Sequence, residues 1–182
     1  MEIAQLLLEQ NADVVALQEA DAKSWWSGNF DHVTTLAKQA HYPWHSHGEH
    51  ARSWLFSYGT AILSRLSISE NVKHTFAPSP PTLTKGFVLS RVSWKAAPHK
   101  SVSVDIISVH LDFSRNTVRK NQIRELLDLI SKRRGPLVVM GDFNSDWLAN
   151  ESIVAELAYQ ARLKVYRPNA TDLPTLVRRR TR

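Results

Sequence analysis

Short apolar runs divided by polar loops make up most of this sequence, and a few longer stretches show helical spacing instead. The runs predict strands at 13–17, 59–65, 66–74, 87–94, 101–112 and 136–140. Apolar residues at three- and four-residue intervals predict helices at 3–10, 31–41, 115–134 and 150–159. A helix that leads directly into an apolar strand is typical of an α/β unit, so the pattern predicts the α/β class.

The stretch 136–146, PLVVMGDFNSD, combines a strand with polar groups at its end. Its apolar run predicts a strand buried on both faces, and Gly141 allows a tight turn after it. If the chain stays extended, Asp142 and Asn144 point to the same side. Because Asp, Asn and Ser also favour turns, this stretch alone allows both a turn and a reactive site.

Two other predicted strands end in similar groups. Gln18 and Glu19 follow the run at 13–17, and His110 and Asp112 follow the strand that begins near residue 101. Ligands gather where strand ends converge, so we expect one shared pocket. Oxygen ligands in a chain without cysteine favour Mg²⁺ or Mn²⁺, and phosphate hydrolysis is the natural use of such a site.

The segment 42–58 is polar and aromatic and is predicted to be a long loop. Four histidines lie in or beside it: His41, His45, His47 and His50. Their spacing matches no established zinc pattern, which favours a structural or substrate-facing loop over a metal site. Four tryptophans could stack on a base, touch a membrane surface or simply pack: Trp25, Trp26, Trp44 and Trp54.

Composition adds limits to this picture. The 182 residues, 43% hydrophobic and 22% charged, predict one globular domain over 1–182 with a disordered basic tail at 168–182. No run is long enough to cross a membrane, so we expect a soluble protein, with the cytoplasm favoured and secretion left open. The net charge of +6, with basic clusters at 132–134 and 178–180, permits a polyanionic partner.

Four segments in this order resemble a known family: ADVVALQEAD, YGTAILSR, SVHLD and VVMGDFNSD. Together they resemble the endonuclease/exonuclease/phosphatase superfamily, which includes DNase I-like nucleases, abasic-site endonucleases, inositol-phosphate phosphatases and neutral sphingomyelinases. The resemblance spans about residues 3–146. It implies a DNase I-like, four-layer α/β/β/α sandwich, and it leaves the substrate open.

The resemblance also implies roles for individual residues. Glu19 matches the metal-binding glutamate, and Asp142 the aspartate that positions or activates the attacking water. Asn144 matches the asparagine that contacts the phosphate, and His110 the histidine that hydrogen-bonds it. Asp112 is assigned to phosphate or substrate binding, or to capping the helix that follows. Arg119 and Gln122 also fall at positions common in the family, with a supporting or structural role.

Two elements of the family pattern have no counterpart in this sequence. The expected first strand, with its metal-binding asparagine, and the final Asp-His pair are missing, since the last histidine is His110. A sandwich incomplete at both ends would expose strand edges. We therefore expect self-association, strand exchange or a partner chain to cover them.

Two hypotheses follow for the function. The first is a divalent-metal-dependent phosphoester hydrolase that uses Mg²⁺ or Mn²⁺, most simply a nuclease-like phosphodiesterase; a phosphatase or sphingomyelinase-like hydrolase of lipid or inositol phosphates is the variant of this idea. The second is a catalytically impaired family member that binds anionic ligands or needs partner strands.

Overall fold

Seven strands in two sheets and four helices make up the described part of the chain. The computed structural model describes residues 2–20, 31–52, 57–145 and 152–166. In chain order the elements are α1 (Glu2–Gln10), β1 (Val14–Ala20), α2 (His32–Gln39), β2 (Trp44–Arg52), β3 (Ser57–Ser64), β4 (Ile68–Thr75), β5 (Gly86–Ala97), β6 (Lys100–His110), α3 (Asn116–Ser131), β7 (Leu137–Asp142) and α4 (Ile153–Gln160).

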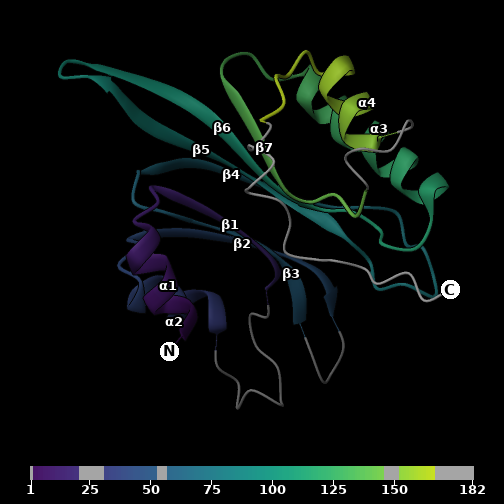
Figure 1. Ribbon diagram of the computed structural model, residues 1–182, viewed down its shortest axis with the longest axis horizontal. Coiled ribbons are helices and arrows are strands. Elements are labelled where there is room, and N and C mark those ends of the chain that lie inside the picture. The colour runs from purple at the N-terminus through teal and green to yellow at the C-terminus, as the bar shows by residue number, and fades with distance from the viewer. Residues whose placement is uncertain (1, 21–30, 53–56, 146–151, 167–182) are drawn as a thin grey trace, which may run out of the picture.

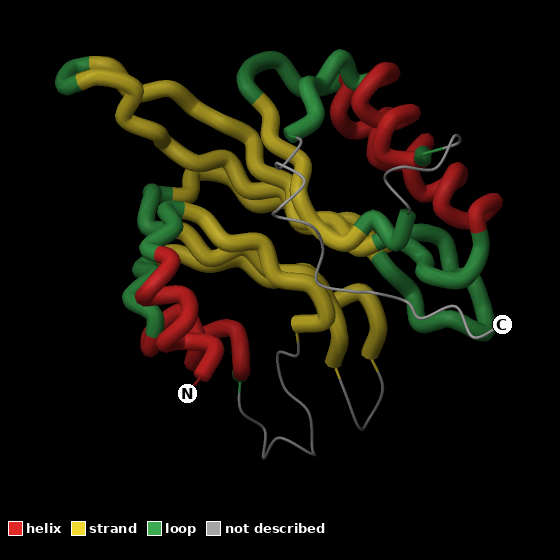
Figure 2. Tube along the Cα trace, in the orientation of Figure 1, coloured by secondary structure: helices red, strands yellow, loops and turns green. Residues whose placement is uncertain are grey.

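The sheets lie face to face, and each is covered by helices on its outer side (Figure 1). One sheet has the order β1-β3-β2 and is antiparallel throughout. The other has the order β4-β5-β6-β7, antiparallel except for the β6–β7 pair that α3 connects. Helices α1 and α2 cover the first sheet, and α3 and α4 cover the second (Figure 2). The predicted four-layer α/β/β/α arrangement is confirmed.

Three apolar clusters fill the spaces between these layers, because alternate residues of each strand point to opposite faces. On β3, Ala61 and Leu63 face α1 and α2, whereas Ile62 packs between the sheets against Val88 and Val92. The largest cluster joins the outer face of β5 and β6 to α3 and α4. The cluster between the sheets is the smallest, so polar contacts add to the junction.

Buried and partly buried hydrogen bonds connect the two sheets across this junction. The Gln18 amide donates to Ser108 Oγ at 3.1 Å, and the hydroxyls of Ser46 and Ser90 lie 2.7 Å apart. The buried imidazole of His50 makes a third connection. Its Nε2 lies 2.9 Å from Thr60 Oγ1 in the same sheet, and its Nδ1 lies 3.2 Å from Thr75 Oγ1 in the other sheet. These bonds fix how the strands of one sheet align with those of the other.

Strands β1 and β7 each form one edge of their sheet, and β2 and β4 form the other edges. Among the described strands, β1 pairs only with β3 and β7 only with β6. The prediction that 136–140 is buried on both faces is wrong, because β7 has one neighbour and Val138 is 42% exposed. The strand predicted at 13–17 is likewise only half buried.

The predicted loop at 42–58 is also wrong over most of its length, because residues 44–52 form β2. The inner face of β2 carries small or hydrogen-bonded residues in place of aliphatic ones. At Gly48 a Cβ atom would lie 2.4 Å from Val88 Cγ2, so the close approach of β5 leaves no room for a side chain. A strand under this restraint lacks the apolar alternation that marks strands in a sequence.

An ion cluster holds the segment after α3 against the second sheet. Arg133 donates to Asp105 and to Glu70 at 2.9 Å each, and Arg91 donates to Asp105 at 2.8 Å. Burial alone would raise the pKa of Asp105, but the hydrogen bonds from Arg133 and Arg91 lower it below its usual range. The cluster therefore fixes the start of β7, two residues beyond Gly135.

The remaining predicted helices and strands are confirmed, with ends that differ by a few residues. Asn11 has the left-handed backbone expected of a residue that ends a helix, with φ at 49°. The predicted tail at 168–182, Trp25, Trp26 and Trp54 lie outside the described residues. No described helix has the length and apolar character needed to span a bilayer.

Candidate active site

The carboxyl ends of β1, β6 and β7 lie at the same end of the sandwich. His110 and Asp142 are register partners in the parallel β6–β7 pair. In the antiparallel first sheet, the end of β1 lies beside the start of β3, where Ala20 is paired with Gly59. Glu19 and Tyr58 therefore meet here, and the Tyr58 and His110 rings, from opposite sheets, have centroids 6.1 Å apart.

His110 is a buried imidazole at the edge of this group, only 2% exposed. Burial lowers its pKa below the usual range, and the nearby Lys85 ammonium adds to this, against the opposing effect of Asp142 and Glu19. Its Nε2 lies 3.8 Å from Asp142 Oδ2, whereas Nδ1 is buried without a partner among the described residues. We assign the proton of the neutral ring to Nε2, because a buried N–H without an acceptor is costly. The imidazole then offers a donor toward Asp142.

The Asp142–Asn144 segment is both a turn and a part of this group. Strand β7 ends at Asp142, and Asn144 adopts a left-handed backbone with φ at 47°. The Asn144 amide N–H donates to Asp142 Oδ1 at 2.9 Å, and its side-chain Nδ2 donates to the Leu111 carbonyl at 2.9 Å. The extended alternation expected here stops at Asp142, and the turn instead places the Asn144 backbone N–H against the Asp142 carboxylate. The Asp142 side chain is 50% exposed and open to water.

A chain of hydrogen bonds crosses from the second sheet to Glu19. The Lys85 ammonium donates to Tyr58 Oη at 2.7 Å, and Tyr58 Oη donates to Glu19 Oε1 at 2.7 Å. Burial and the bond to Glu19 raise the pKa of Tyr58, so the phenol keeps its proton. Burial lowers the pKa of Lys85, while the carboxylates of Glu19, Asp142 and Asp112 oppose that effect.

Asp112 lies beside the group but faces into the protein. Its carboxylate is fully buried and accepts bonds from the Thr82 hydroxyl at 2.6 Å and from the backbone N–H groups of Ser114 and Arg115. Burial would raise its pKa, but these donors lower it to about 2. The contacts resemble the helix-capping alternative, just before α3, and its role in phosphate binding stays a prediction.

Two residues of α3 hold the Asp112 backbone in the same region. Gln122 Oε1 accepts from the Asp112 N–H at 2.8 Å, and Arg119 donates to the Asp112 carbonyl at 2.9 Å. Together with the bond from Asn144 to Leu111, they hold both carbonyls of the turn after β6. Arg119 and Gln122 thus contact backbone and none of the reactive groups directly.

The donor set at Glu19 fits a hard divalent cation that has water and substrate as further ligands. Glu19 is exposed, and only one of its oxygens, Oε1, receives a hydrogen bond within the described residues. Among those residues no three acidic, histidine or cysteine side chains converge closely enough to enclose a metal. Mg²⁺ is commonly held by one or two carboxylates plus substrate phosphate, so a single carboxylate suffices for that mode.

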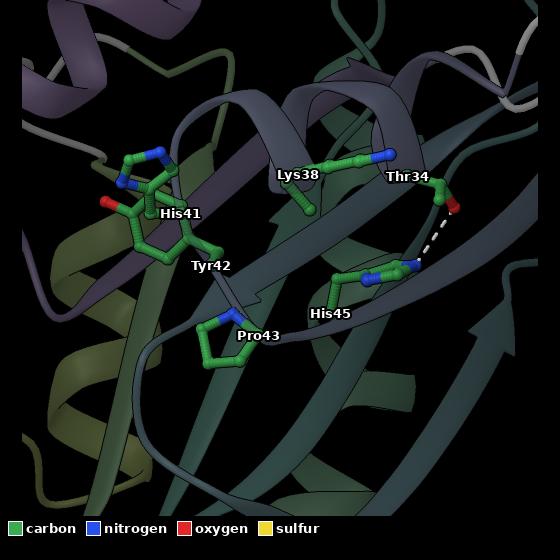
Figure 3. Close-up of a pocket in the computed structure, with 7 residues that line it drawn as sticks. Thr34, Lys38, His41, Tyr42, Pro43 and His45 are labelled. Atoms are coloured by element: carbon green, nitrogen blue, oxygen red, sulfur yellow. Dashed lines mark hydrogen bonds between the residues drawn. The ribbon is translucent and has the colours of Figure 1, made fainter.

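Two surface depressions of the described residues lie away from this group. One of about 510 Å³ lies between α2 and the start of β2, lined by Thr34, Ala37, Lys38, His41, Tyr42, Pro43 and His45 (Figure 3). In it Thr34 Oγ1 lies 3.1 Å from His45 Nε2. This depression is on the helix-covered face of the first sheet and contains none of the strand-end residues. The candidate site is therefore located by the ionisable groups that converge at the strand ends and does not coincide with this depression.

Sequence reasoning missed Tyr58 and Lys85. Both precede predicted strands, at 59–65 and 87–94, whereas the candidates predicted from the sequence all follow strands. In an antiparallel sheet a strand begins where its neighbour ends, so polar residues that open a strand belong to the same search. That signal was present in the sequence.

The sequence itself matches a described family over most of its length. Residues 2–163 match the model of the Endonuclease/Exonuclease/phosphatase family. The chain belongs to this family. The family is one of phosphoester hydrolases, in agreement with the group of acids, amide and imidazole at the strand ends. Among curated proteins, none matches the sequence.

Solved structures of the family share the fold. A family member from Beutenbergia cavernae superposes with a TM-score of 0.68 at 20% identity, over 87% of this chain and 47% of that one. D. rerio TDP2, complexed with a single-strand DNA product, gives 0.58 at 20% identity, over 86% and 56%. ANGEL2, a 2′,3′-cyclic phosphatase, gives 0.59 at 18% identity, over 80% and 43%. This chain therefore spans about half the length of the structures it resembles.

Proposed function

We propose that this chain is a divalent-metal-dependent phosphodiesterase that hydrolyses nucleic acid. The observation that carries the proposal is the convergence of Asp142, a neutral His110 and the Glu19 carboxylate at one end of the sandwich. A general base, a hydrogen-bond donor and a cation ligand are the groups that in-line hydrolysis of a phosphodiester needs.

Each residue has a role in this proposal. Asp142 accepts a proton from the attacking water as the water oxygen bonds to phosphorus. The N–H of His110 Nε2 donates to one phosphate oxygen. The Asn144 side-chain amide uses one N–H for the Leu111 carbonyl, so its second N–H is available for another phosphate oxygen. The bond from phosphorus to the leaving oxygen breaks, and that oxygen takes a proton from solvent.

Glu19 would hold Mg²⁺ or Mn²⁺ in this arrangement. The bound cation would neutralise charge on the phosphate. Tyr58 orients the Glu19 carboxylate through its hydrogen bond and leaves the second oxygen open.

Nucleic acid is the preferred substrate for two reasons. The net charge of +6 favours a polyanion, and one structural relative, D. rerio TDP2, was captured with a single-strand DNA product. The cyclic phosphatase ANGEL2 supports a phosphatase as the variant. A single carboxylate ligand favours the second alternative, an impaired member that binds anions with little turnover.

The open edges of β1 and β7 also enter the proposal. We infer that further strands pair with them, from a second copy or from another stretch of polypeptide. The parallel bonds from Asp105 N to the Pro136 carbonyl and from Leu111 N to the Asp142 carbonyl set the ladder. By that alternation the backbone groups of Val139 point away from β6, toward the open edge.

The test is cleavage of plasmid DNA and of bis(p-nitrophenyl) phosphate with Mg²⁺, with Mn²⁺ and with chelator. We expect Asp142→Ala to lower the rate about 100-fold or more, the usual contribution of a general base. Asp128→Ala is the matched control, because Asp128 is an exposed acid paired with Lys132 on the surface of α3. Cleavage that persists in Asp142→Ala would reject the site, and absence of cleavage with either metal would favour the impaired alternative.

A further inference from the structure

Lys85 is a buried cation that contacts no carboxylate of the described residues directly and is connected to the Glu19 carboxylate through one residue, Tyr58. Its side chain belongs to a residue only 4% exposed, and its ammonium donates to the neutral phenol of Tyr58. The ammonium also lies 4.5 Å from the centre of the Tyr58 ring. A buried charge is costly unless it is compensated. The nearest compensation along the hydrogen bonds is the Glu19 carboxylate, which receives the Tyr58 hydroxyl.

We propose that Lys85 is the resident counterion of Glu19, acting through Tyr58, and that it competes with a divalent cation for that carboxylate. This inference rests on the proposed function, because it takes Glu19 as the metal ligand. It adds a positioning residue outside the residues assigned to the reaction. It also makes metal affinity depend on a side chain that contacts no metal.

The distances set the size of the competition. Two hydrogen bonds of 2.7 Å in series place the Lys85 ammonium within 5.4 Å of Glu19 Oε1. A cation that this carboxylate would hold at about 2 Å would be on the order of 7 Å from the ammonium. At this separation the repulsion between a divalent cation and the singly charged Lys85 ammonium would weaken binding of the cation about tenfold even at the dielectric constant of water. In a site with less water the repulsion would be stronger.

A phosphate group reverses the effect. An anion bound between the two cations is attracted by both, so the repulsion that opposes the metal becomes a shared attraction for phosphate. Metal binding and phosphate binding then strengthen each other, and by linkage each changes the affinity for the other by the same factor. Lys85 would thus make the metal bind best when substrate is present.

The experiment is calorimetric titration of the full chain with Mn²⁺, with and without inorganic phosphate. Lys85→Met removes the charge and keeps an apolar chain of similar length. We expect it to bind Mn²⁺ about tenfold more tightly than the unmodified protein without phosphate, and to gain less from added phosphate. Lys85→Arg, which keeps the charge, should bind as the unmodified protein does. Lys100→Met, an exposed lysine on the β5–β6 turn at the opposite end of β6, controls for net charge.

The outcomes separate the two proposals. Unchanged or weaker Mn²⁺ binding in Lys85→Met, with binding still lost in Glu19→Gln, would overturn the role of Lys85 and keep the metal ligand. Mn²⁺ binding unaffected by Glu19→Gln would overturn both. Urea unfolding verifies that each variant is folded, and Lys85→Gln replaces Lys85→Met if the latter is not.

Discussion

The buried imidazole of His50 predicts a specific loss of stability in mild acid. Burial lowers its pKa to about 3, and the positive charges of its neighbours contribute. In the unfolded chain the pKa returns to the usual histidine value of 6.5. Between these values the unfolded state binds a proton that the folded state does not, so the free energy of unfolding falls as the pH falls.

The magnitude follows from the two pKa values. Going from about pH 7 to about pH 5, protonation of His50 in the unfolded chain alone should lower the stability by about 2 kcal/mol, at 1.36 kcal/mol per pKa unit. His50→Gln should be less stable near pH 7 by about 1–2 kcal/mol, because it loses bonds to Thr60 or Thr75. The variant has no imidazole to protonate, so its stability should approach that of the unmodified protein near pH 5.

Urea unfolding followed by tryptophan fluorescence at several pH values measures both curves. His99→Gln, at the exposed turn between β5 and β6, should lower no part of the curve and serves as the control. A gap between His50→Gln and the unmodified protein that stays constant from about pH 7 to about pH 5 would refute the reasoning. It would mean that the imidazole takes up a proton in the folded state as easily as in the unfolded one.

Three other changes have defined outcomes. Asp112→Asn should cost about 1–3 kcal/mol of stability near neutral pH, because the buried acceptor of several donors is weakened. Urea unfolding at falling pH should show the unmodified protein lose this advantage as Asp112 protonates, between its usual pKa of 3.8 and about 2. Arg133→Met should lower the free energy of unfolding, measured in urea, by about 1–3 kcal/mol, since Asp105 and Glu70 keep only Arg91; equal stability would contradict the ion cluster. Val139→Pro blocks the outward backbone of β7, so light scattering should show the mass fall to that of a monomer. A monomeric, cooperatively unfolding unmodified protein would contradict the strand-pairing inference.

The strand ends were predictable because the physics there is local. Apolar runs that stop at an acid, an amide or an imidazole mark Glu19, His110 and Asp142, and a sheet brings such ends together. The family match at residues 2–163 and the two-sheet fold agree with the resemblance that those segments suggest. The role of each residue stays a prediction until the cleavage assays are done.

Strand β2 was not predictable by the same means, because the residues on its inner face are determined by contacts with the opposite sheet. Ser46 makes a hydrogen bond with Ser90 and His50 makes one with Thr75. At Gly48 the side chain of Val88 leaves no space for a Cβ atom. Each choice is a response to a residue more than twenty positions away. A local pattern contains no trace of that partner, so polar residues there suggest a loop.

The contact between Lys85 and Tyr58 escaped for a related reason. The two residues are 27 positions apart: Tyr58 lies in β3 of the first sheet, and Lys85 immediately precedes β5 of the second. Their charge and hydroxyl are ordinary in a sequence, and only the packing of the sheets shows that the lysine is buried. A contact between residues of two different layers, such as this hydrogen bond, leaves no local pattern in the sequence.

Glu19 and Tyr58 belong to one sheet, whereas His110, Asp142 and Asn144 belong to or follow the other. The spacing between the proposed cation ligand, Glu19, and the proposed base, Asp142, is therefore set by the side chains packed between the sheets. Exchanging a serine such as Ser90 or Ser108 for a larger residue would wedge the layers apart and separate the two halves of the site. Reactivity in this architecture can thus be adjusted, by evolution or by design, at positions that no substrate ever touches.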